Sequence, residues 1–261
     1  MMELEAHGPD TFVAAGPRYP WGGLFGGQIV AQGLRAAAAT VDGDYRVHSL
    51  HAYFIRAGDH AQPIRLEVDR LRNGRSFVTR AVVARQSTGA ILNMSASFQI
   101  DEAATDVQAA TPPEVDKPDA LPPTAWSPMF DRRYVGADET GRATAWLRMS
   151  EGLADDPVLH ACALAYLSDD TPTEAVAALH PGAGPSWSEH TFVSFSLDHA
   201  IWFHRPLDAA TTDPDGWQLH DFRCHGLLSS RGLAVGQIFS GEAHVATVAQ
   251  EVLLRPRRPA P

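Results

Sequence analysis

The sequence predicts an α+β fold in which two related halves each place one helix against an antiparallel sheet. Segments that alternate apolar and polar residues, as strands do, follow a helix-like segment in both halves of the chain. A proline-rich stretch with few large apolar residues separates the two sets. The order of segments before that stretch is repeated after it, which indicates a duplicated unit.

The first half is predicted to contain one helix followed by four strands. Residues 25–35 include Gly26 and Gly27 and precede an alanine run, which indicates a glycine-led entry into a buried helix. Turn residues separate the strand-like segments, and Asn73-Gly74 and Thr88-Gly89 favour hairpins. The predicted strands are residues 48–54, 64–70, 77–85 and 91–100.

The second half is predicted to follow the same order after a linker. Residues 102–128 carry six prolines, so we predict a first unit at 1–105, a proline-rich linker at 106–125 and a second unit at 126–261. Asp156 is suited to cap a helix with Pro157 at its first position, and Pro172 is expected to end the apolar body that follows. The strands predicted after it are residues 191–197, 201–205, 217–224, 233–239 and 243–254.

Individual residues also match between the two halves. They occur in the same order and in similar strand contexts, at offsets that differ by a few residues, as loops of unequal length would produce. The matched pairs, with the offset of each, are Tyr53 with Trp202 (149), Arg75 with Arg231 (156), and Gln99 with Gln250 (151).

Composition excludes several classes of protein. With 44% hydrophobic and 20% charged residues, the 261-residue chain has the composition of a globular protein, and its net charge of −10 argues against binding nucleic acid. No apolar run reaches the roughly 18 residues needed for membrane insertion, and the first residues lack a signal peptide, so we expect a cytoplasmic protein. Cys162 and Cys224 lie outside any Cys-x-x-Cys pair, which predicts buried thiols and no metal site.

Longer motifs resemble the acyl-CoA thioesterase II family. They are residues 25–28 (Phe-Gly-Gly-Gln) and 47–59 in the first half, and 165–169, 197–206 and 248–251 in the second. The resemblance spans nearly the whole chain and implies two tandem hotdog units, each a long central helix wrapped by a curved antiparallel sheet. It also implies hydrolysis of an acyl-CoA thioester to free acid and CoA, with CoA as part of the substrate, no other cofactor and no covalent nucleophile.

The same resemblance implies a catalytic trio in the second half. Motif by motif, the family's aspartate, threonine and glutamine fall on Asp169, Ser196 and Gln250. Serine in place of threonine keeps the hydroxyl and loses only a methyl group. Asp169 is expected at the C-terminal end of a helix, where the helix dipole and the neighbouring Asp170 would raise the pKa of its carboxyl toward that of a useful base.

Three further residues are candidates for substrate binding. Gly26 and Gly27 would let a thioester approach a backbone N–H that stabilises the oxyanion, or they form a tight turn that packs a buried helix; the residues alone leave both interpretations open. His51 lies in the most specific motif, although a histidine that alternates with Tyr53 on a strand is more often structural. The candidate arginines for binding the CoA phosphates are Arg70, Arg72, Arg75, Arg132, Arg133, Arg255, Arg257 and Arg258.

Two other functions and the oligomeric state stay open. Asp155 and His160 faintly resemble the signature of hotdog enoyl-CoA hydratases, but the proline stands three residues before His160 where that signature has it two before. Asp156-Pro157 is already explained as a helix start, so we take the structural interpretation. A non-catalytic acyl-CoA-binding protein is the third hypothesis. Two units in one chain supply an internal pairing, which leaves a homo-oligomer open.

Overall fold

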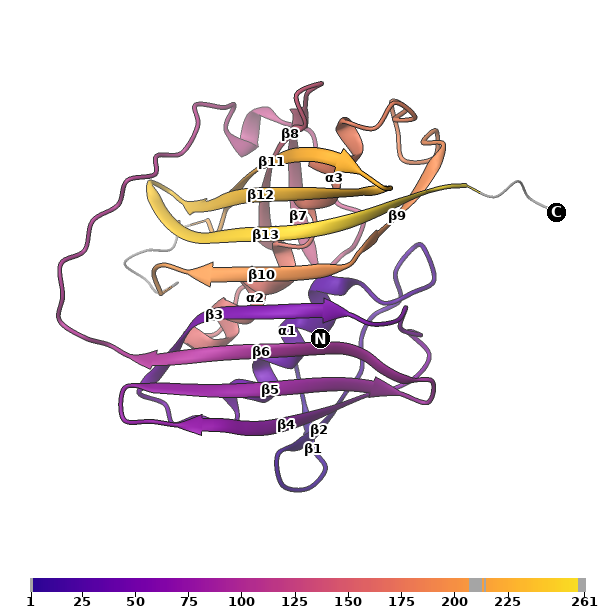
Figure 1. The fold of residues 1–261 in the computed structure, drawn as a ribbon. Helices are drawn as coiled ribbons and strands as arrows, with labels where there is room; N and C mark the ends of the chain where they lie inside the picture. Colours follow the sequence, from indigo (N-terminus) through magenta and orange to yellow (C-terminus); the bar gives the residue numbers. More distant parts are fainter. Residues whose placement is uncertain (1, 207–212, 214, 258–261) are drawn as a thin grey trace.

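The first half folds as a helix surrounded by strands. The computed structural model describes residues 2–206, 213 and 215–257. In the view of Figure 1, helices α1 and α2 lie behind a broad sheet. The elements of the first half are β1 (Glu5–Ala6), β2 (Thr11–Ala14), α1 (Gly26–Ala38), β3 (Tyr45–Phe54), β4 (Ile64–Asn73), β5 (Phe77–Gln86) and β6 (Gly89–Ile100).

The second half contains a similar series with more helix. Its elements are the 3₁₀ helix η1 (Pro118–Ala120), β7 (Phe130–Ala137), β8 (Arg142–Met149), α2 (Pro157–Leu167), α3 (Thr171–Ala178), β9 (Phe192–Ser196), β10 (Asp198–Phe203), β11 (Gln218–Leu228), β12 (Arg231–Ser240) and β13 (Ala243–Pro256). Within the described residues the strands form one antiparallel sheet in the order β1-β2-β4-β5-β6-β3-β10-β13-β12-β11-β8-β7, with β9 beside β13.

The α+β prediction and most predicted elements are confirmed, while two hairpins were missed. The helix expected from residue 25 is α1, the four strands of the first half are β3 to β6, and the five of the second half are β9 to β13. The pairs β1–β2 and β7–β8 were not predicted. Strand β7 runs through two adjacent arginines, Arg132 and Arg133, which break the apolar alternation that marks a strand.

Pro172 lies in the first turn of a further helix, α3, and does not end α2 as predicted. Helix α2 begins as predicted, because the Asp156 side chain accepts a hydrogen bond from the Val158 N–H and Pro157 occupies the first turn. It ends at Leu167, and Pro172 then lies in the first turn of α3, where the missing N–H of proline costs nothing. The chain therefore bends between Leu167 and Thr171, and Asp169 lies in that bend.

Strands β3 and β10 join the two halves about an approximate two-fold axis. His51 is paired with Ala200, at an offset of 149 residues, and the neighbouring pairs are Tyr53–Asp198 and Ser49–Trp202. An axis through the His51–Ala200 pair also matches the β-bulges of the β5–β6 and β12–β13 pairs, at Ala84/Arg85 and Ile238/Phe239. This axis exchanges Tyr53 with Trp202, which confirms the first of the matched pairs.

The other two matched pairs are wrong. Ser95 beside His51 corresponds to Ala249 beside Ala200, so the offset in the last strands is 154 residues (249 − 95). At this offset Gln250 corresponds to Ala96 and not to Gln99. By the same register Arg231 corresponds to Phe77 and not to Arg75. The correspondence between the two halves follows from strand pairing. Residues of similar type near the strand ends do not occupy equivalent positions.

One hydrophobic core extends through both halves. It includes Ile29 from α1, Leu50 from β3, Tyr166 from α2 and Val248 from β13. Since the core is shared, the unit boundaries given above stay a prediction. A smaller cluster on the second half, around Trp146 and neighbouring apolar side chains, is covered by residues of the connection between β6 and β7, which Figure 1 shows running past the ends of the strands on the left.

Two smaller sequence predictions concern the cysteines and the membrane. Cys162 and Cys224 are both free and buried, as expected. Over the described part of the chain, none of the helices combines the length and the apolar character that a membrane span requires.

Candidate active site

Helix α1 begins at two glycines because another helix end approaches it closely. A Cβ atom added to Gly27 would lie 2.2 Å from the Tyr166 carbonyl oxygen in α2, and one added to Gly26 would lie 2.5 Å from Oδ2 of Asp169. No side chain caps the helix, so its first N–H groups are free to bind other acceptors. The Gly27 N–H donates to Asp169 Oδ2 at 2.8 Å. The two glycines therefore allow α2 to pack closely against α1, and the same helix start binds the Asp169 carboxylate.

Asp169 is a buried carboxylate between two helix ends. Only 4% of its surface is exposed. It follows the C-terminus of α2, while its carboxylate lies at the N-terminus of α1, 142 residues away in sequence at Gly27. The positive end of the α1 dipole favours the ionised form of this carboxylate. A residue of the second half is therefore held by the helix of the first.

Burial is the main reason why the carboxyl of Asp169 is a weak acid. It raises the pKa of Asp169 from 3.8 to about 7, against the lowering effect of hydrogen bonds from Ser196, Gly27 and Gln250. The charge of Asp170 adds the smallest contribution to this pKa. The sequence prediction of a raised pKa has the right direction, but burial is the leading cause, where a helix dipole had been expected.

Ser196 and Gln250 complete a connected group of three side chains. Ser196 is the last residue of β9, and its Oγ donates to Asp169 Oδ1 at 3.0 Å. Gln250 lies on β13 with no exposed surface, and its Nε2 donates to Ser196 Oγ at 2.9 Å. The pairing of Ser196 with Val252 sets the two strands in this register. The structure thus brings together the three residues named from the sequence.

Two buried residues that contact this group were missed from the sequence. His199 has no exposed surface, and its Nδ1 lies within hydrogen-bond distance of Gln250 Oε1. Its Nε2 lies 2.8 Å from the hydroxyl of Ser168, which is also fully buried. Burial lowers the pKa of His199 to about 4, so the ring is neutral. His199 follows Asp198 in one of the quoted motifs, which was the available signal.

Asp170 belongs to a second buried network next to Asp169. Its carboxylate accepts hydrogen bonds from Trp126 Nε1 at 2.7 Å and from Arg132 Nε at 2.9 Å. Arg132 also donates to Glu174 at 2.9 Å, and all three charged groups are largely buried. The arginine thus shares its charge between two carboxylates. This pairing explains why Asp170 has only a small influence on Asp169.

Aromatic rings enclose the start of α1. Phe25 contacts Trp126 and Tyr166 edge to face, at centroid distances of 5.0 and 5.2 Å. Tyr19 packs beside Phe25, and its hydroxyl lies 3.4 Å from that of Tyr166. These rings keep water away from one side of the helix start. They account for part of the low dielectric environment that raises the pKa of Asp169.

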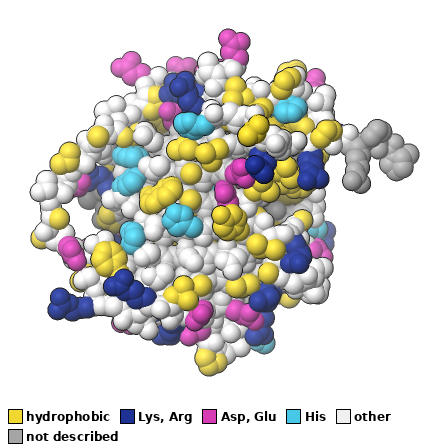
Figure 2. Space-filling model, viewed as in Figure 1, with side chains coloured by type: hydrophobic (Ala, Val, Ile, Leu, Met, Phe, Trp, Pro, Cys, Tyr) yellow, Lys and Arg dark blue, Asp and Glu magenta, His cyan; other side chains and the backbone are white. Residues whose placement is uncertain are grey.

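His51 lies away from this site. It is exposed on β3, between the buried residues Leu50 and Ala52, and its ring packs against Trp202 at 5.2 Å. It therefore points to the face of the sheet opposite the helices, where Figure 2 shows histidine and hydrophobic side chains interspersed. The position of His51 does not support a substrate-binding role, because the alternation of side chains along the strand directs His51 away from the helices.

The residues of the hydratase hypothesis lie away from this site, and the structure bears on two of the candidate arginines. Asp155 precedes α2 and His160 lies in its first turns, at the opposite end of the helix from Asp169. Arg132 is occupied by its buried carboxylates. The candidate Arg258 falls outside the described residues.

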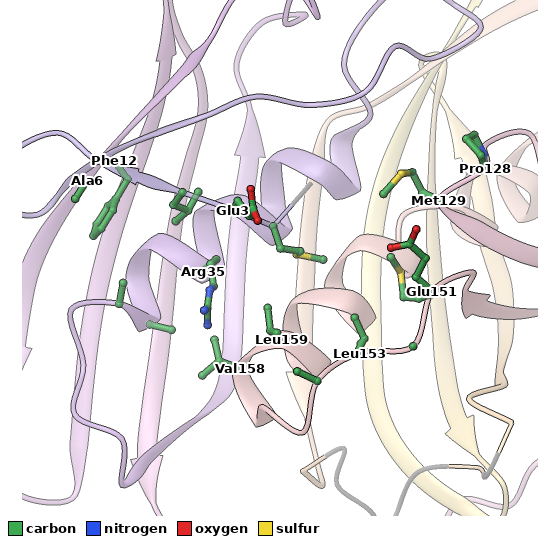
Figure 3. Close-up of a pocket in the computed structure, with 17 residues that line it drawn as sticks. Glu3, Ala6, Phe12, Arg35, Pro128, Met129, Glu151, Leu153, Val158 and Leu159 are labelled. Atoms are coloured by element: carbon green, nitrogen blue, oxygen red, sulfur yellow. The ribbon is translucent and has the colours of Figure 1, made fainter.

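A cavity of about 840 Å³ lies at the other end of the helix pair. Figure 3 shows Arg35 from α1 together with Val158 and Leu159 from α2 around it. Arg35 Nη1 pairs with Asp156 Oδ2 at 3.3 Å and connects the two helices there. Asp169, Ser196, Gln250 and the two glycines are not among the residues that line this cavity.

Comparison with known proteins identifies relatives along the whole chain. Residues 15–99 match the family model of the acyl-CoA thioesterase N-terminal domain, and residues 119–253 match that of acyl-CoA thioesterase. The chain is 33% identical over 259 residues to acyl-CoA thioesterase 2 of Haemophilus influenzae, covering 89% of this chain and 87% of that protein.

Solved structures show the same fold. An acyl-CoA thioesterase II from Mycobacterium marinum superposes with a TM-score of 0.82 at 35% identity, covering 100% of this chain and 97% of that one. A hot dog fold protein of unknown function from Alicyclobacillus acidocaldarius has a TM-score of 0.78 at 19% identity, covering 98% and 97%. This second likeness concerns the fold alone.

The hotdog fold and the matches to acyl-CoA thioesterases define a hotdog-fold thioester hydrolase. The chain belongs to the acyl-CoA thioesterase family, which confirms the resemblance found in the sequence.

Proposed function

We propose that the chain hydrolyses acyl-CoA thioesters with a water molecule activated by Asp169 and oriented with the help of Ser196 and Gln250. The observation that carries this proposal is the convergence of these three side chains on one another at the start of α1. A carboxyl with a pKa of about 7 is matched to proton transfer near neutral pH. The names of the relatives support acyl-CoA as the substrate class.

The proposed reaction needs one water and no covalent intermediate. Ionised Asp169 removes a proton from water as the water oxygen bonds to the thioester carbonyl carbon. The tetrahedral oxyanion then collapses, the carbon–sulfur bond breaks, and the leaving thiolate of CoA takes the proton back from Asp169. The products are the free acid and CoA, and the carboxylate is regenerated. CoA enters as part of the substrate, and the scheme requires no metal or other cofactor.

The start of α1 supplies the donor proposed for the oxyanion. The Gly27 N–H is already bound to Asp169, so it is occupied while the carboxylate is in this position. Gly26, the first residue of the helix, presents the adjacent N–H, and its missing side chain lets Asp169 and Phe54 pack closely against the helix start. Such preorganised donors stabilise the transition state more than the ground state.

A thiol-release assay tests the proposal. Wild type should liberate free thiol from acyl-CoA, and Asp169→Asn should lower kcat by about 10²–10⁴-fold because the base is lost. His51→Ala serves as the control, since its side chain lies on the far face of the sheet and its rate should equal that of wild type. An Asp169→Asn variant that hydrolyses acyl-CoA at the wild-type rate would show that the site is wrong.

A further inference from the structure

A chain of buried hydrogen bonds continues from Gln250 away from the proposed reaction site. Gln250 Nε2 faces Ser196, while its Oε1 faces Nδ1 of His199. The other ring nitrogen of His199 lies 2.8 Å from Ser168 Oγ. Gln250, His199 and Ser168 have no exposed surface, so water cannot replace any of these contacts at low cost. The proposed reaction does not use His199 or Ser168.

The proton positions in this chain follow from the atoms that meet. An amide oxygen only accepts hydrogen bonds, so Nδ1 of His199 must carry the ring proton where it faces Gln250. A neutral imidazole has one N–H, so Nε2 then accepts from the Ser168 hydroxyl. The amide nitrogen of Gln250 is left to face Ser196. In this arrangement each side chain donates a hydrogen bond to the next, in the order Ser168, His199, Gln250, Ser196 and Asp169.

The opposite arrangement of the amide would disturb the base. If the Gln250 side chain turned over, its oxygen would face Ser196, and the hydroxyl of Ser196 would be drawn away from Asp169. The ionised carboxylate would then lose the hydrogen bonds that it accepts from Ser196 and Gln250. A glutamine amide is nearly symmetric in shape, so packing alone does not select one orientation. The selection needs a donor on the far side.

We propose that His199, held by Ser168, is a positioning residue that keeps the Gln250 amide nitrogen directed at Ser196 and Asp169. This inference rests on the proposed function, because it assigns His199 a role only through Gln250. His199 touches no reacting atom and transfers no proton to the substrate.

Ser168 sets which ring nitrogen carries the proton. Its hydroxyl has one proton and two acceptors within reach, Nε2 of His199 at 2.8 Å and the Ala165 carbonyl oxygen at 3.0 Å. Donation to His199 fixes the proton on Nδ1 and the productive amide orientation. Donation to Ala165 would move the ring proton to Nε2 and favour the turned amide. Ser168 is the C-cap residue of α2, which places its hydroxyl between these two acceptors.

Two substitutions at His199 separate positioning from packing. His199→Phe fills the space without a donor, and kcat should fall about 10–100-fold while KM changes less than about twofold. His199→Asn can place an amide N–H where Nδ1 stands, and it should recover kcat to within about fivefold of wild type. Equal losses in the two variants, or an unchanged kcat in His199→Phe, would overturn the inference.

A double-mutant cycle shows whether His199 acts through Gln250. In a Gln250→Ala background, the further change His199→Phe should alter kcat less than about twofold, because there is no amide left to orient. Losses that multiply independently would contradict the proposal. His48→Phe is the matched control, since His48 forms a similar pair with Ser97 at 2.8 Å in the first half and contacts none of the proposed site residues.

The same measurements distinguish failure of the proposed function from failure of the role of His199, and a second variant is available if His199→Phe does not fold. If wild type releases no thiol, or if Gln250→Ala retains full activity, the proposed function fails, and this inference falls with it. If Asp169→Asn and Gln250→Ala are impaired but the cycle is additive, only the role of His199 fails. Should circular dichroism show His199→Phe unfolded, Ser168→Ala takes its place, with an expected loss of about threefold to tenfold that disappears in Gln250→Ala.

Discussion

Replacing Asp169 with asparagine is expected to make the folded protein more stable, relative to wild type, at alkaline pH than at acidic pH, while it slows hydrolysis. The wild-type carboxyl is 4% exposed, and burial raises its pKa from 3.8 to about 7. The folded chain therefore keeps this group protonated over a pH range in which the unfolded chain has already released the proton. Ionising it in the folded state costs free energy, and the neutral asparagine avoids this cost.

The sign and size of the effect follow from the two pKa values. Because the folded state binds more protons than the unfolded state between them, wild type loses stability as the pH rises from about 4 to about 7. The whole shift corresponds to about 4 kcal/mol at about 1.4 kcal/mol per pKa unit. From about pH 5.5 to about pH 8.5 the loss is about 2 kcal/mol. Asparagine also weakens the hydrogen bonds of the site, but that loss is the same at both pH values.

Denaturant unfolding at the two pH values measures this difference. The free energy of unfolding of Asp169→Asn minus that of wild type should be about 2 kcal/mol larger at about pH 8.5 than at about pH 5.5. Asp119→Asn, at an exposed position of η1, is the matched control for the removal of one carboxyl group. A difference for Asp169→Asn that stays constant, or that shrinks as the pH rises, would refute burial as the cause of the raised pKa.

Three further predictions concern the rate, the helix start and the buried arginine. Thiol release should rise about tenfold per pH unit up to about pH 7 and then level off as Asp169 ionises; a flat profile would argue against it as the base. In unfolding experiments Gly27→Ala should lose about 1–3 kcal/mol, because its Cβ would lie 2.2 Å from a backbone oxygen of α2, whereas Gly43→Ala, with no atom within 4 Å, should stay near wild type. Arg132→Met should lose about 3–5 kcal/mol by leaving two buried carboxylates unpaired, and a loss as small as that of Arg46→Met, from an exposed pair, would contradict this.

Periodicity predicted most of the strands because those strands alternate between a core face and a solvent face. Strand β7 shows where this reasoning stops. Its residues Arg132 and Arg133 indicate an exposed or irregular segment, yet Arg132 is buried because Asp170 and Glu174 neutralise it. Those partners lie 38 and 42 residues further along the chain. A local pattern carries no information about such pairing, so the β7–β8 hairpin could not be found from the sequence.

The candidate site shows a similar division. Asp169 lies in the bend between α2 and α3, Ser196 on β9 and Gln250 on β13, and as isolated residues each has an ordinary structural explanation. Only the resemblance grouped them. Packing at the start of α1, which the pattern of residues did not reveal, supplies the burial that raises the pKa of Asp169. His199 was visible within a motif, but its contact with Gln250 depends on the side-by-side pairing of β10 and β13.

The approximate two-fold axis explains why a duplicated fold carries one such group of side chains. By strand register, the counterpart of Gln250 is Ala96 and that of Ser196 is Val47, neither of which offers a polar side chain. The corresponding end of the helix pair carries the Arg35–Asp156 ion pair and the cavity. The end of the helix pair proposed as the active site needs both halves, since the helix start that binds Asp169 belongs to the first half. Duplication within one chain therefore allows the two halves to diverge, one providing the helix start and the other the proposed acid–base group, while the shared sheet holds them in register.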